Sequence, residues 1–428
     1  CTHVQVWLHS YSGSVVSAYV DDLELRKGVH VKPSDDSAAP RPVQAAAVNF
    51  SAGPHPFLLV TPDDLSRMSA MARSQEWARN ALSNFLETAK RRNAAAIVHP
   101  DRGGGWYHWY ACPKDGGQLQ TVSATEHRCS RCGKVYTGDP YDAVPIMSQH
   151  NDLAARCRDL GLAYALTGDA EFAKTVRTIL LGYADRYATY ELHDTRGPSK
   201  RASAGRVGPQ TLDESCWLIP VAQGYDLIYE SDLLSTADRR HIEVDLLRAA
   251  AAIIRRHDAG KSNWQSWHNA GMGAVAFCLR DRELAEHVVN GRSGFQAQMV
   301  NSVTDEGFWY EGAWGYHYYA LSAHLALTEM AFRSGTDLYG NPRYRGLYDI
   351  PMRFMAPNRQ LPAFHDSGLS SGLPGTPYLE VAFRHWQDPN VAWGIHQRGR
   401  GWDALLRGLP DVPDVAAPDL HSVNFAGP

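Results

Sequence analysis

Most of the chain distributes its apolar and polar residues with the spacing of an α-helix. Thr61 and Pro62, followed by Asp63 and Asp64, have the composition of a helix start, with a capping hydroxyl, an early proline and two acids. A single apolar stripe runs through Phe172, Val176, Ile179, Leu180, Tyr183 and Tyr187. The same kind of pattern predicts helices at about 62–90, 153–166, 172–187, 211–230, 236–257, 266–279, 282–303 and 314–333.

Short joints that contain Gly, Asp or Ser separate these predicted helices, for example at 231–232, 258–260 and 334–337. A helix, a short turn and another helix, repeated along a chain, is typical of an α/α toroid or of an α-solenoid. The sequence shows no repeat of fixed period, which favours the toroid. We therefore expect a mainly α protein with an α/α toroid over residues 49–428.

The two ends of the chain have the pattern of β-strands instead. Residues 3–9 and 14–26 are partly alternating and flank a turn at 10–13. Because two strands cannot bury a core by themselves, we expect residues 1–31 to be a hairpin remnant, the end of a carbohydrate-binding-like β-sandwich module. Residues 32–48 are rich in Pro, Ala and Ser and have the composition of a linker. Residues 420–425 have the pattern of the start of another β element.

Composition narrows the function classes. The 428 residues are 44% hydrophobic and 21% charged, with a net charge of −4, which argues against nucleic acid or an acidic membrane surface as a partner. No run of 18 apolar residues occurs, so we expect no transmembrane helix and place the protein outside the membrane. We expect the numbering to begin after any signal peptide. Twelve Trp and twenty Tyr suit a sugar-binding cleft as well as a core. The sequence carries no signal for the oligomeric state.

Residues 106–142 contain a cysteine cluster inside the predicted toroid. Cys112 lies 17 residues before Cys129, which begins a Cys-x-x-Cys-Gly knuckle with Cys132. Such a knuckle lets two thiolates reach one ion from a tight turn, and zinc prefers four ligands of this kind. We expect a structural zinc ion here and no organic cofactor. The alternative is one disulfide bond with one free thiol.

Three cysteines leave the fourth zinc ligand to another residue type. His108 lies four residues before Cys112, Asp115 takes the place of a second knuckle cysteine, and His127 directly precedes the second knuckle. We favour His108, because imidazole is the commoner zinc ligand.

Polar and aromatic residues gather in four segments of the helical background, at 210–217, 262–269, 305–319 and 361–368. In an α/α toroid the starts of the inner helices face the same rim. We therefore expect these segments to meet in one groove.

The order of residues in these segments resembles the heparinase II/III-like and alginate lyase superfamily of polysaccharide lyases. The resemblance is carried by Asn263-Trp264 with His268-Asn269, by Asp305-x-Gly307-Phe308-x-x-Glu311-Gly312-x-x-x-Tyr316-His317, and by Leu361-Pro362-x-Phe364-x-Asp366-Ser367-Gly368. It covers about residues 50–428, including the cysteine-rich insert. It implies an incomplete α/α toroid followed by an antiparallel β-sandwich domain, which would be missing after the C-terminus of this chain. It also implies a secreted enzyme with an acidic polysaccharide as its partner.

The chemistry implied by this resemblance is β-elimination at a uronic acid. A base removes the C5 proton, an acid protonates the departing O4 oxygen, and the enzyme must neutralise the neighbouring carboxylate. By resemblance, Tyr316 is the general acid and could also be a base, and His268 neutralises the carboxylate or acts as base. Asn263 is an amide neutraliser, although Trp267 stands where some members have Asn. The substrate-contact candidates are Gln210, Trp264, Glu311 and His365.

Two other functions stay open at this point. A glycoside hydrolase on a similar toroid needs two carboxylates across the scissile bond, and Glu214, Asp305, Glu311 and Asp366 supply enough acids. A non-catalytic carbohydrate-binding protein would carry similar aromatic residues. Among uronate polymers, the sequence does not distinguish alginate from a glycosaminoglycan or a glucuronan, or endo from exo cleavage.

Overall fold

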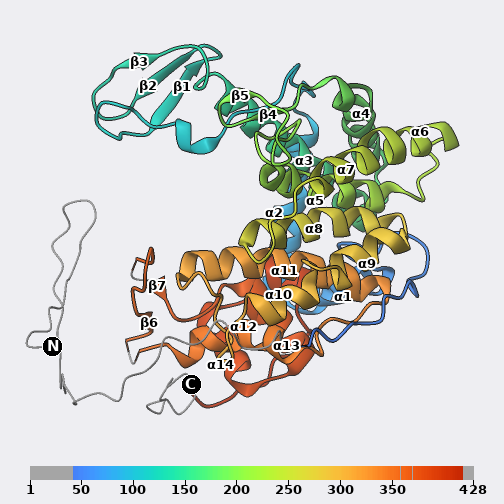
Figure 1. The fold of residues 1–428 in the computed structure, drawn as a ribbon. Coiled ribbons are helices and arrows are strands. Elements are labelled where there is room, and N and C mark those ends of the chain that lie inside the picture. The colour runs from blue at the N-terminus through green and yellow to red at the C-terminus, as the bar shows by residue number, and fades with distance from the viewer. Residues whose placement is uncertain (1–41, 357, 369, 418–428) are drawn as a thin grey trace, which may run out of the picture. The chain divides into compact units, whose positions relative to one another are not determined.

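A computed structural model describes residues 42–356, 358–368 and 370–417. This part is an incomplete α/α toroid, as predicted (Figure 1). The predicted hairpin at 1–31 and the predicted β element at 420–425 lie outside the described residues. No helix in the described part combines the length and apolar character that a membrane span requires.

The helices follow one another along the whole described chain. They are α1 (Pro62–Ser74), α2 (Glu76–Asn93), α3 (Ala143–Thr167), α4 (Ala170–Arg186), α5 (Thr211–Ile228), α6 (Thr236–His241), the π-helix η3 (Ile242–Arg248), α7 (Ala249–Arg255), α8 (Asn263–Cys278), α9 (Arg282–Asn290), α10 (Phe295–Asn301), α11 (Trp314–Ser334), α12 (Pro342–Arg353), α13 (Thr376–Trp386), α14 (Pro389–Arg398) and α15 (Trp402–Arg407). The 3₁₀ turns are η1 (Tyr107–Trp109) and η2 (Tyr187–Thr189).

Several helix boundaries differ from the prediction. The helix predicted over 62–90 is interrupted at Gln75, whose extended backbone ends α1. The helix predicted over 282–303 is divided between α9 and α10 by Gly291–Gly294. Helix α8 begins three residues earlier than predicted, so Asn263 lies in its first turn rather than in the preceding joint. Helices α12 to α15 were not predicted, and three of them are short segments with a proline near the start.

The strands are short and lie outside the helical layers. The cysteine-rich insert forms an antiparallel sheet with the order β1 (Leu119–Ser123), β2 (Glu126–Cys129), β3 (Val135–Tyr136). In its register Leu119 pairs with Cys129 and His127 pairs with Tyr136. Two small hairpins complete the strands, β4 (His193–Asp194) with β5 (Gly197–Pro198), and β6 (Gln360–Leu361) with β7 (Ser370–Ser371).

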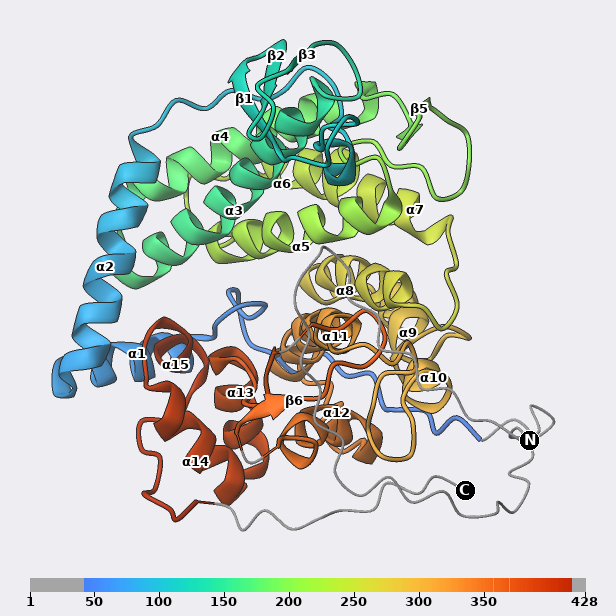
Figure 2. The same ribbon diagram turned by 90° about the vertical axis from the view of Figure 1, so that its left-hand side faces the viewer.

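Four long helices form a row, in which α3 packs on α5, α5 on α8, and α8 on α11 (Figure 2). Two glycines of α8 allow the close approach. A Cβ atom on Gly271 would lie 2.9 Å from the Cα of Ser215 on α5, and one on Gly273 would lie 2.5 Å from Cδ1 of Leu327 on α11. Any larger side chain at either position would push α8 away from one neighbour. The packing therefore fixes the positions of residues along α5, α8 and α11 relative to one another.

The extended segment at 42–61 is anchored to this row. Asp226 on α5 is fully buried, and its Oδ2 accepts hydrogen bonds from the backbone amides of Phe57 (2.9 Å) and Leu58 (2.8 Å). Its Oδ1 lies 2.6 Å from Nδ1 of His55. Both carboxylate oxygens are therefore used for anchoring.

A buried ionic cluster joins α1 to α11 and α13. Arg333 donates from Nε to Oδ2 of Asp64 (3.1 Å) and from Nη2 to Oε2 of Glu329 (2.7 Å). Arg384 also bonds Asp64, through Oδ1 at 3.1 Å. Burial raises the pKa of Asp64, but Arg333, Arg384 and Arg67 outweigh it and lower this pKa to about 2. The carboxylate is therefore ionised and paired at neutral pH.

We expect Asp64→Asn to destabilise the protein by about 3–5 kcal/mol at pH 7, because it leaves Arg333 buried without its full set of partners. The pKa of Asp64 lies below its unfolded value of 3.8, so its ionisation stabilises the fold above about pH 4 and loses this effect as the pH falls toward 2. The stability difference between wild type and variant, measured by chemical denaturation, should narrow below about pH 4. Asp63→Asn, at the exposed neighbouring position, is the control and should change little.

Candidate active site

The first turns of α5, α8 and α11 meet at one end of the helix row. Cys216, Trp267 and Tyr319 are the sixth, fifth and sixth residues of these helices. The rings of Trp267 and Tyr319 lie 5.1 Å apart between centroids, and the Tyr319 phenol interacts with the Cys216 thiol. Contact at nearly equal depth requires that the three helices begin on the same side. We call this end the rim, comprising residues 210–216, 257–268, 309–319 and 361–368.

The structure brings the predicted polar segments together at the rim. The side-chain amide of Asn263 donates to Oε2 of Glu311 (2.8 Å), which links the start of α8 to the loop before α11. Gly312, with φ of +74°, lies directly against the His365 ring. The Trp314 amide donates to Oγ of Ser367 (2.7 Å). Segments 262–269, 305–319 and 361–368 are therefore contiguous, as predicted.

The fourth segment, at the start of α5, joins them through a residue that the sequence analysis did not single out. The hydroxyl of Thr211 lies 3.0 Å from Nδ1 of His257. The His257 ring is 5.3 Å from the His268 ring and 5.6 Å from the Trp264 ring, between centroids. His257 is half-buried and lies in the turn before α8. It connects α5 with the His268 neighbourhood.

His268 is an unusual histidine because its ring is both buried and unpaired. Its exposed fraction is 0%, and neither ring nitrogen has a hydrogen-bond partner among the described residues. Burial lowers the pKa of His268 to about 3, the charge of His257 lowers it further, and the backbone of His257 opposes this only weakly. The imidazole is therefore neutral at any pH near 7. A buried polar group without a partner is costly, and such groups gather at functional sites.

Tyr316 has the opposite environment. It lies in the first turn of α11 with 41% of its surface exposed. Its phenol is therefore accessible to a large substrate at the rim. Tyr319, one turn further along α11, is nearly as exposed at 37%, but partial burial and the neighbouring Cys216 raise the pKa of its phenol.

The remaining predicted contact residues all lie at the rim, and they differ in burial and in the hydrogen bonds that they already form. Trp264 is half-buried beside His257 and His268. Glu311 already accepts from Asn263 and, at 2.7 Å, from the indole of Trp309, so it fixes the Asn263 side chain. Gln210 is half-buried at the N-cap position of α5, where its side chain makes no capping hydrogen bond, and His365 is exposed in the 361–368 loop.

Asp213 is a second rim residue that the sequence analysis did not single out. Its Oδ2 is buried without a hydrogen-bond partner in the described part of the chain. Burial and the neighbouring Glu214 raise the pKa of Asp213 to about 7. An acid in the first turn of a helix has an ordinary explanation in the helix dipole, which is why sequence alone did not distinguish it. A carboxyl group that titrates near neutral pH can take up or release a proton during catalysis.

Two of the acids that a hydrolase would need, Glu214 and Asp305, already form structural interactions with other residues. Glu214 is fully buried and accepts from the Tyr187 hydroxyl (2.6 Å) and from the backbone amides of residues 206–208. Asp305 forms an ion pair with Arg343. Both carboxylates therefore hold loops in place.

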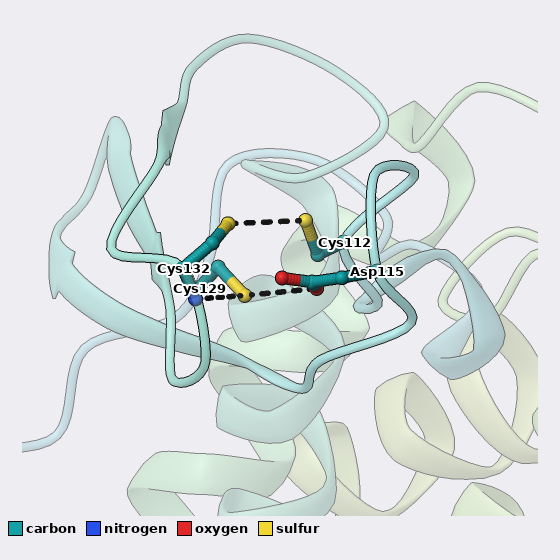
Figure 3. A group of neighbouring side chains, drawn as sticks. All are labelled: Cys112, Asp115, Cys129 and Cys132. Atoms are coloured by element: carbon teal, nitrogen blue, oxygen red, sulfur yellow. Dashed lines mark hydrogen bonds between the residues drawn. The ribbon is translucent and has the colours of Figure 1, made fainter.

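The cysteine cluster lies in the insert, where Cys112, Asp115, Cys129 and Cys132 are neighbours (Figure 3). Sγ of Cys112 lies 3.8 Å from Sγ of Cys132, and Sγ of Cys129 lies 3.3 Å from Oδ1 of Asp115. The four ligand atoms all lie within 4.8 Å of one another. This donor set suits a metal ion that prefers sulfur ligands.

The structure places Asp115, and not the favoured His108, beside the three cysteines. His108 is exposed and its ring packs on Trp106, with 4.7 Å between centroids. His127 is also outside the group, since its ring lies 2.7 Å from the Tyr110 hydroxyl and 2.9 Å from Oδ1 of Asp142. Asp115 occupies the fourth place because the turn at 112–117 brings its carboxylate over the sulfurs.

A pocket of about 850 Å³ lies between the insert and the β4–β5 hairpin. Its wall includes Trp106, His108, Trp109, Cys112, His193 and Arg196. His108 therefore faces this pocket rather than the cysteine group.

Comparison with known proteins assigns this helical chain to a class, the alginate lyases. A crystal structure of an alginate lyase from Bacteroides ovatus has the same fold, with a TM-score of 0.59 at 13% identity over 84% of this chain and 100% of that one. Residues 99–358 match the family model described as alginate lyase. The chain belongs to the alginate lyase family.

Two curated relatives match most of the described chain. An "Alginate lyase" of Stenotrophomonas maltophilia is 30% identical over 301 residues, which is 68% of this chain and 34% of that protein. An "Exo-oligoalginate lyase" of Saccharophagus degradans is 25% identical over 288 residues, which is 64% of this chain and 33% of that protein. The matched part of this chain thus spans about a third of the length of either relative.

We expect His268→Leu to make the protein more stable at pH 7 by about 1–2 kcal/mol, because leucine removes an unpaired buried imidazole. The pKa of His268 lies below its unfolded value of 6.5. Below pH 6.5 the unfolded wild-type chain therefore takes up a proton that the folded chain does not, at about 1.4 kcal/mol per pH unit. Denaturation between pH 7 and 4 should show a shallower loss of stability in the variant. The exposed His396→Leu should keep the wild-type slope, and an unchanged slope in His268→Leu would contradict the neutral state.

Asp213→Asn tests the raised pKa of that carboxyl group. Its pKa lies above the unfolded value of 3.8, so between about pH 4 and 7 the unfolded chain releases a proton that the folded chain keeps, which lowers wild-type stability. The variant does not ionise, and we expect it to gain about 2–4 kcal/mol relative to wild type between pH 4.5 and 8. Asp232→Asn, in an exposed turn, should show no such gain. A constant difference across this range would mean that Asp213 titrates normally.

Proposed function

We propose that the protein is a lyase that cleaves a uronic-acid-containing polysaccharide, alginate in the first instance, by β-elimination. The new chain end would carry an unsaturated uronate. The observation that carries the proposal is the position of the exposed Tyr316, the amide of Asn263 and the buried His268 in the first two turns of α8 and α11, which adjoin at the rim, in a chain of the alginate lyase family.

The electrostatics of the rim suit an anionic chain. Helices α5, α8 and α11 point their N-terminal ends toward it, and each such end carries partial positive charge and free backbone amides. Lys261, exposed in the turn before α8, holds its ammonium group 4.6 Å from the centre of the Tyr310 ring. A uronate carboxylate placed here meets dipoles and a cation. This supports binding of an anionic polymer at the rim.

Tyr316 is our proposed general acid for the departing O4 oxygen. Its exposure at the first turn of α11 lets it reach a polymer that lies across the rim. Removal of the C5 proton creates negative charge that extends onto the carboxylate, so donors fixed beforehand are most effective. Glu311 holds Asn263 in one orientation, which suits its proposed role as such a donor.

The neutral state of His268 changes the role that we propose for it. An uncharged imidazole cannot neutralise a carboxylate by charge, so we assign it proton abstraction and leave neutralisation to Asn263, Lys261 and the helix ends. Because His268 has no exposed surface, the half-buried His257 is the member of the pair nearer to the substrate. We therefore propose that His257 and His268 act together, and that the substrate reaches His268 after the Trp264 ring shifts.

The alternative of a glycoside hydrolase finds less support at this rim. Hydrolysis needs two free carboxyl groups across the scissile bond, and Glu214 and Asp305 are held by structural hydrogen bonds and an ion pair. Glu311 is likewise occupied by two donors.

The decisive experiment incubates the protein with alginate and with other uronate polymers and follows ultraviolet absorbance. We expect absorbance from the conjugated double bond to appear with alginate. Tyr316→Phe should lower kcat by about 10²–10⁴-fold, because a general acid contributes that much. Tyr310→Phe, which alters an equally exposed phenol in the same segment, is the matched control and should retain activity.

Three results would contradict parts of this proposal. Full turnover by Tyr316→Phe would remove it as the acid. New reducing ends without ultraviolet absorbance would indicate hydrolysis instead of elimination. Binding of the polymers without any product would indicate a carbohydrate-binding protein.

A further inference from the structure

We propose that the cysteine-rich insert binds one zinc ion through Cys112, Asp115, Cys129 and Cys132, with Asp115 as the fourth ligand. The proposal concerns a site outside the rim and does not depend on the lyase function. Its basis is the arrangement of four donor atoms on two tight turns (Figure 3).

Two distances between donor atoms match those of a tetrahedral zinc site. With Zn–S bonds of about 2.3 Å, two thiolates of a tetrahedron lie about 3.8 Å apart. The distance between Sγ of Cys112 and Sγ of Cys132 is 3.8 Å. With a Zn–O bond of about 2.0 Å, a sulfur and an oxygen ligand lie about 3.5 Å apart, and Cys129 Sγ lies 3.3 Å from Asp115 Oδ1.

These distances do not suit the alternative of a disulfide bond. A disulfide requires about 2.05 Å between its sulfurs, and the cysteines at 112, 129 and 132 are all unbridged. In the thiolate form in which cysteine binds a metal, these groups and Asp115 would be four anionic donors that repel one another without a cation between them. A divalent ion at their centre removes this repulsion.

The two turns that carry the ligands have the same design. Each presents its ligands three residues apart, Cys112 with Asp115 and Cys129 with Cys132. Each turn is closed by a backbone hydrogen bond from a glycine, Gly116 to Cys112 (2.8 Å) and Gly133 to Cys129 (3.1 Å). Both glycines have positive φ, +67° and +72°, which residues with a side chain adopt at a cost. Asp115 therefore stands where a matching knuckle would place its second cysteine.

The surroundings of the donor atoms also suit a resident ion. The amide of Arg131 donates to Sγ of Cys129 (3.3 Å), and the Tyr136 hydroxyl lies 3.0 Å from Sγ of Cys112. Such hydrogen bonds orient metal-bound thiolates and influence how strongly they bind the metal. A set of three thiolates and one carboxylate in a tetrahedral arrangement favours zinc over calcium or magnesium, which prefer oxygen ligands.

The zinc ion would fix one wall of the 850 Å³ pocket. Cys112 belongs both to the ligand group and to the pocket wall, and the turn η1 with Trp106 and Trp109 directly precedes it. The short sheet β1–β2–β3 has only a small apolar cluster of its own, with Leu119 between Cys112 and Cys129. Small units of this kind commonly need a metal to hold their shape.

The test measures the metal content of the full chain, purified without added metal, by mass spectrometry of the elements. We expect one zinc ion per chain. Asp115→Ala should weaken zinc binding at least tenfold in competition with a chromogenic chelator, since even indirect contacts contribute that much. Asp115→Cys should retain zinc and release it more slowly, because it completes a four-cysteine site. His108→Ala is the matched control and should bind zinc like wild type.

Each other outcome overturns a defined part of the proposal. Zinc loss in His108→Ala with zinc retention in Asp115→Ala would return the fourth ligand to His108. Iron in place of zinc would overturn the identity of the metal. A metal-free chain with a disulfide found by peptide mass mapping would overturn the site. Far-ultraviolet circular dichroism of the helices identifies a variant that has lost its fold, and Asp115→Cys still tests the site in that case. None of these readouts depends on lyase activity.

Discussion

The close packing of α8 between α5 and α11 is the constraint on which the rim depends. Gly271 and Gly273 let α8 approach both neighbours closely enough that a Cβ atom at either position would overlap them. This fixes the three helices in depth, so that Cys216, Trp267 and Tyr319 meet and the first turns lie side by side. Three positive helix ends, an exposed phenol and a buried imidazole are thereby held at one end of the helix row, and the contacts of Glu311, His257 and Ser367 tie the neighbouring loops to it.

Buried polar groups of the ionic cluster and of the rim differ in whether they have hydrogen-bond partners. Asp64, Arg333 and Glu329, remote from the rim in sequence and contact, form a satisfied ionic cluster in which each charge has a partner. At the rim, His268 and Asp213 keep buried polar atoms without partners. Leaving these two groups unpaired costs stability, and titratable groups perturbed in this way gather at functional sites.

The cysteine-rich insert is stabilised in a different way from the helix row. Its strands are short and its apolar cluster is small, so burial alone gives it little stability. Two glycine-closed turns instead bring four metal-binding atoms together. A metal held there would support the wall of a pocket that contains two tryptophans, an arginine and two histidines. The helical row and the insert thus use different means, close packing in one and ligand geometry in the other.

The sequence by itself determined the elements whose causes are local. Helix periodicity, caps and glycine joints predicted the mainly α fold, and the order of motifs in 262–269, 305–319 and 361–368 predicted segments that the structure indeed joins. The tertiary structure alone decided the choices that depend on distance between remote residues. Local spacing did not separate His108 from Asp115, since a turn decides which of them reaches the sulfurs. The same holds for His257 beside His268 and for the raised pKa of Asp213, because burial and neighbouring charge exist only after the chain has folded.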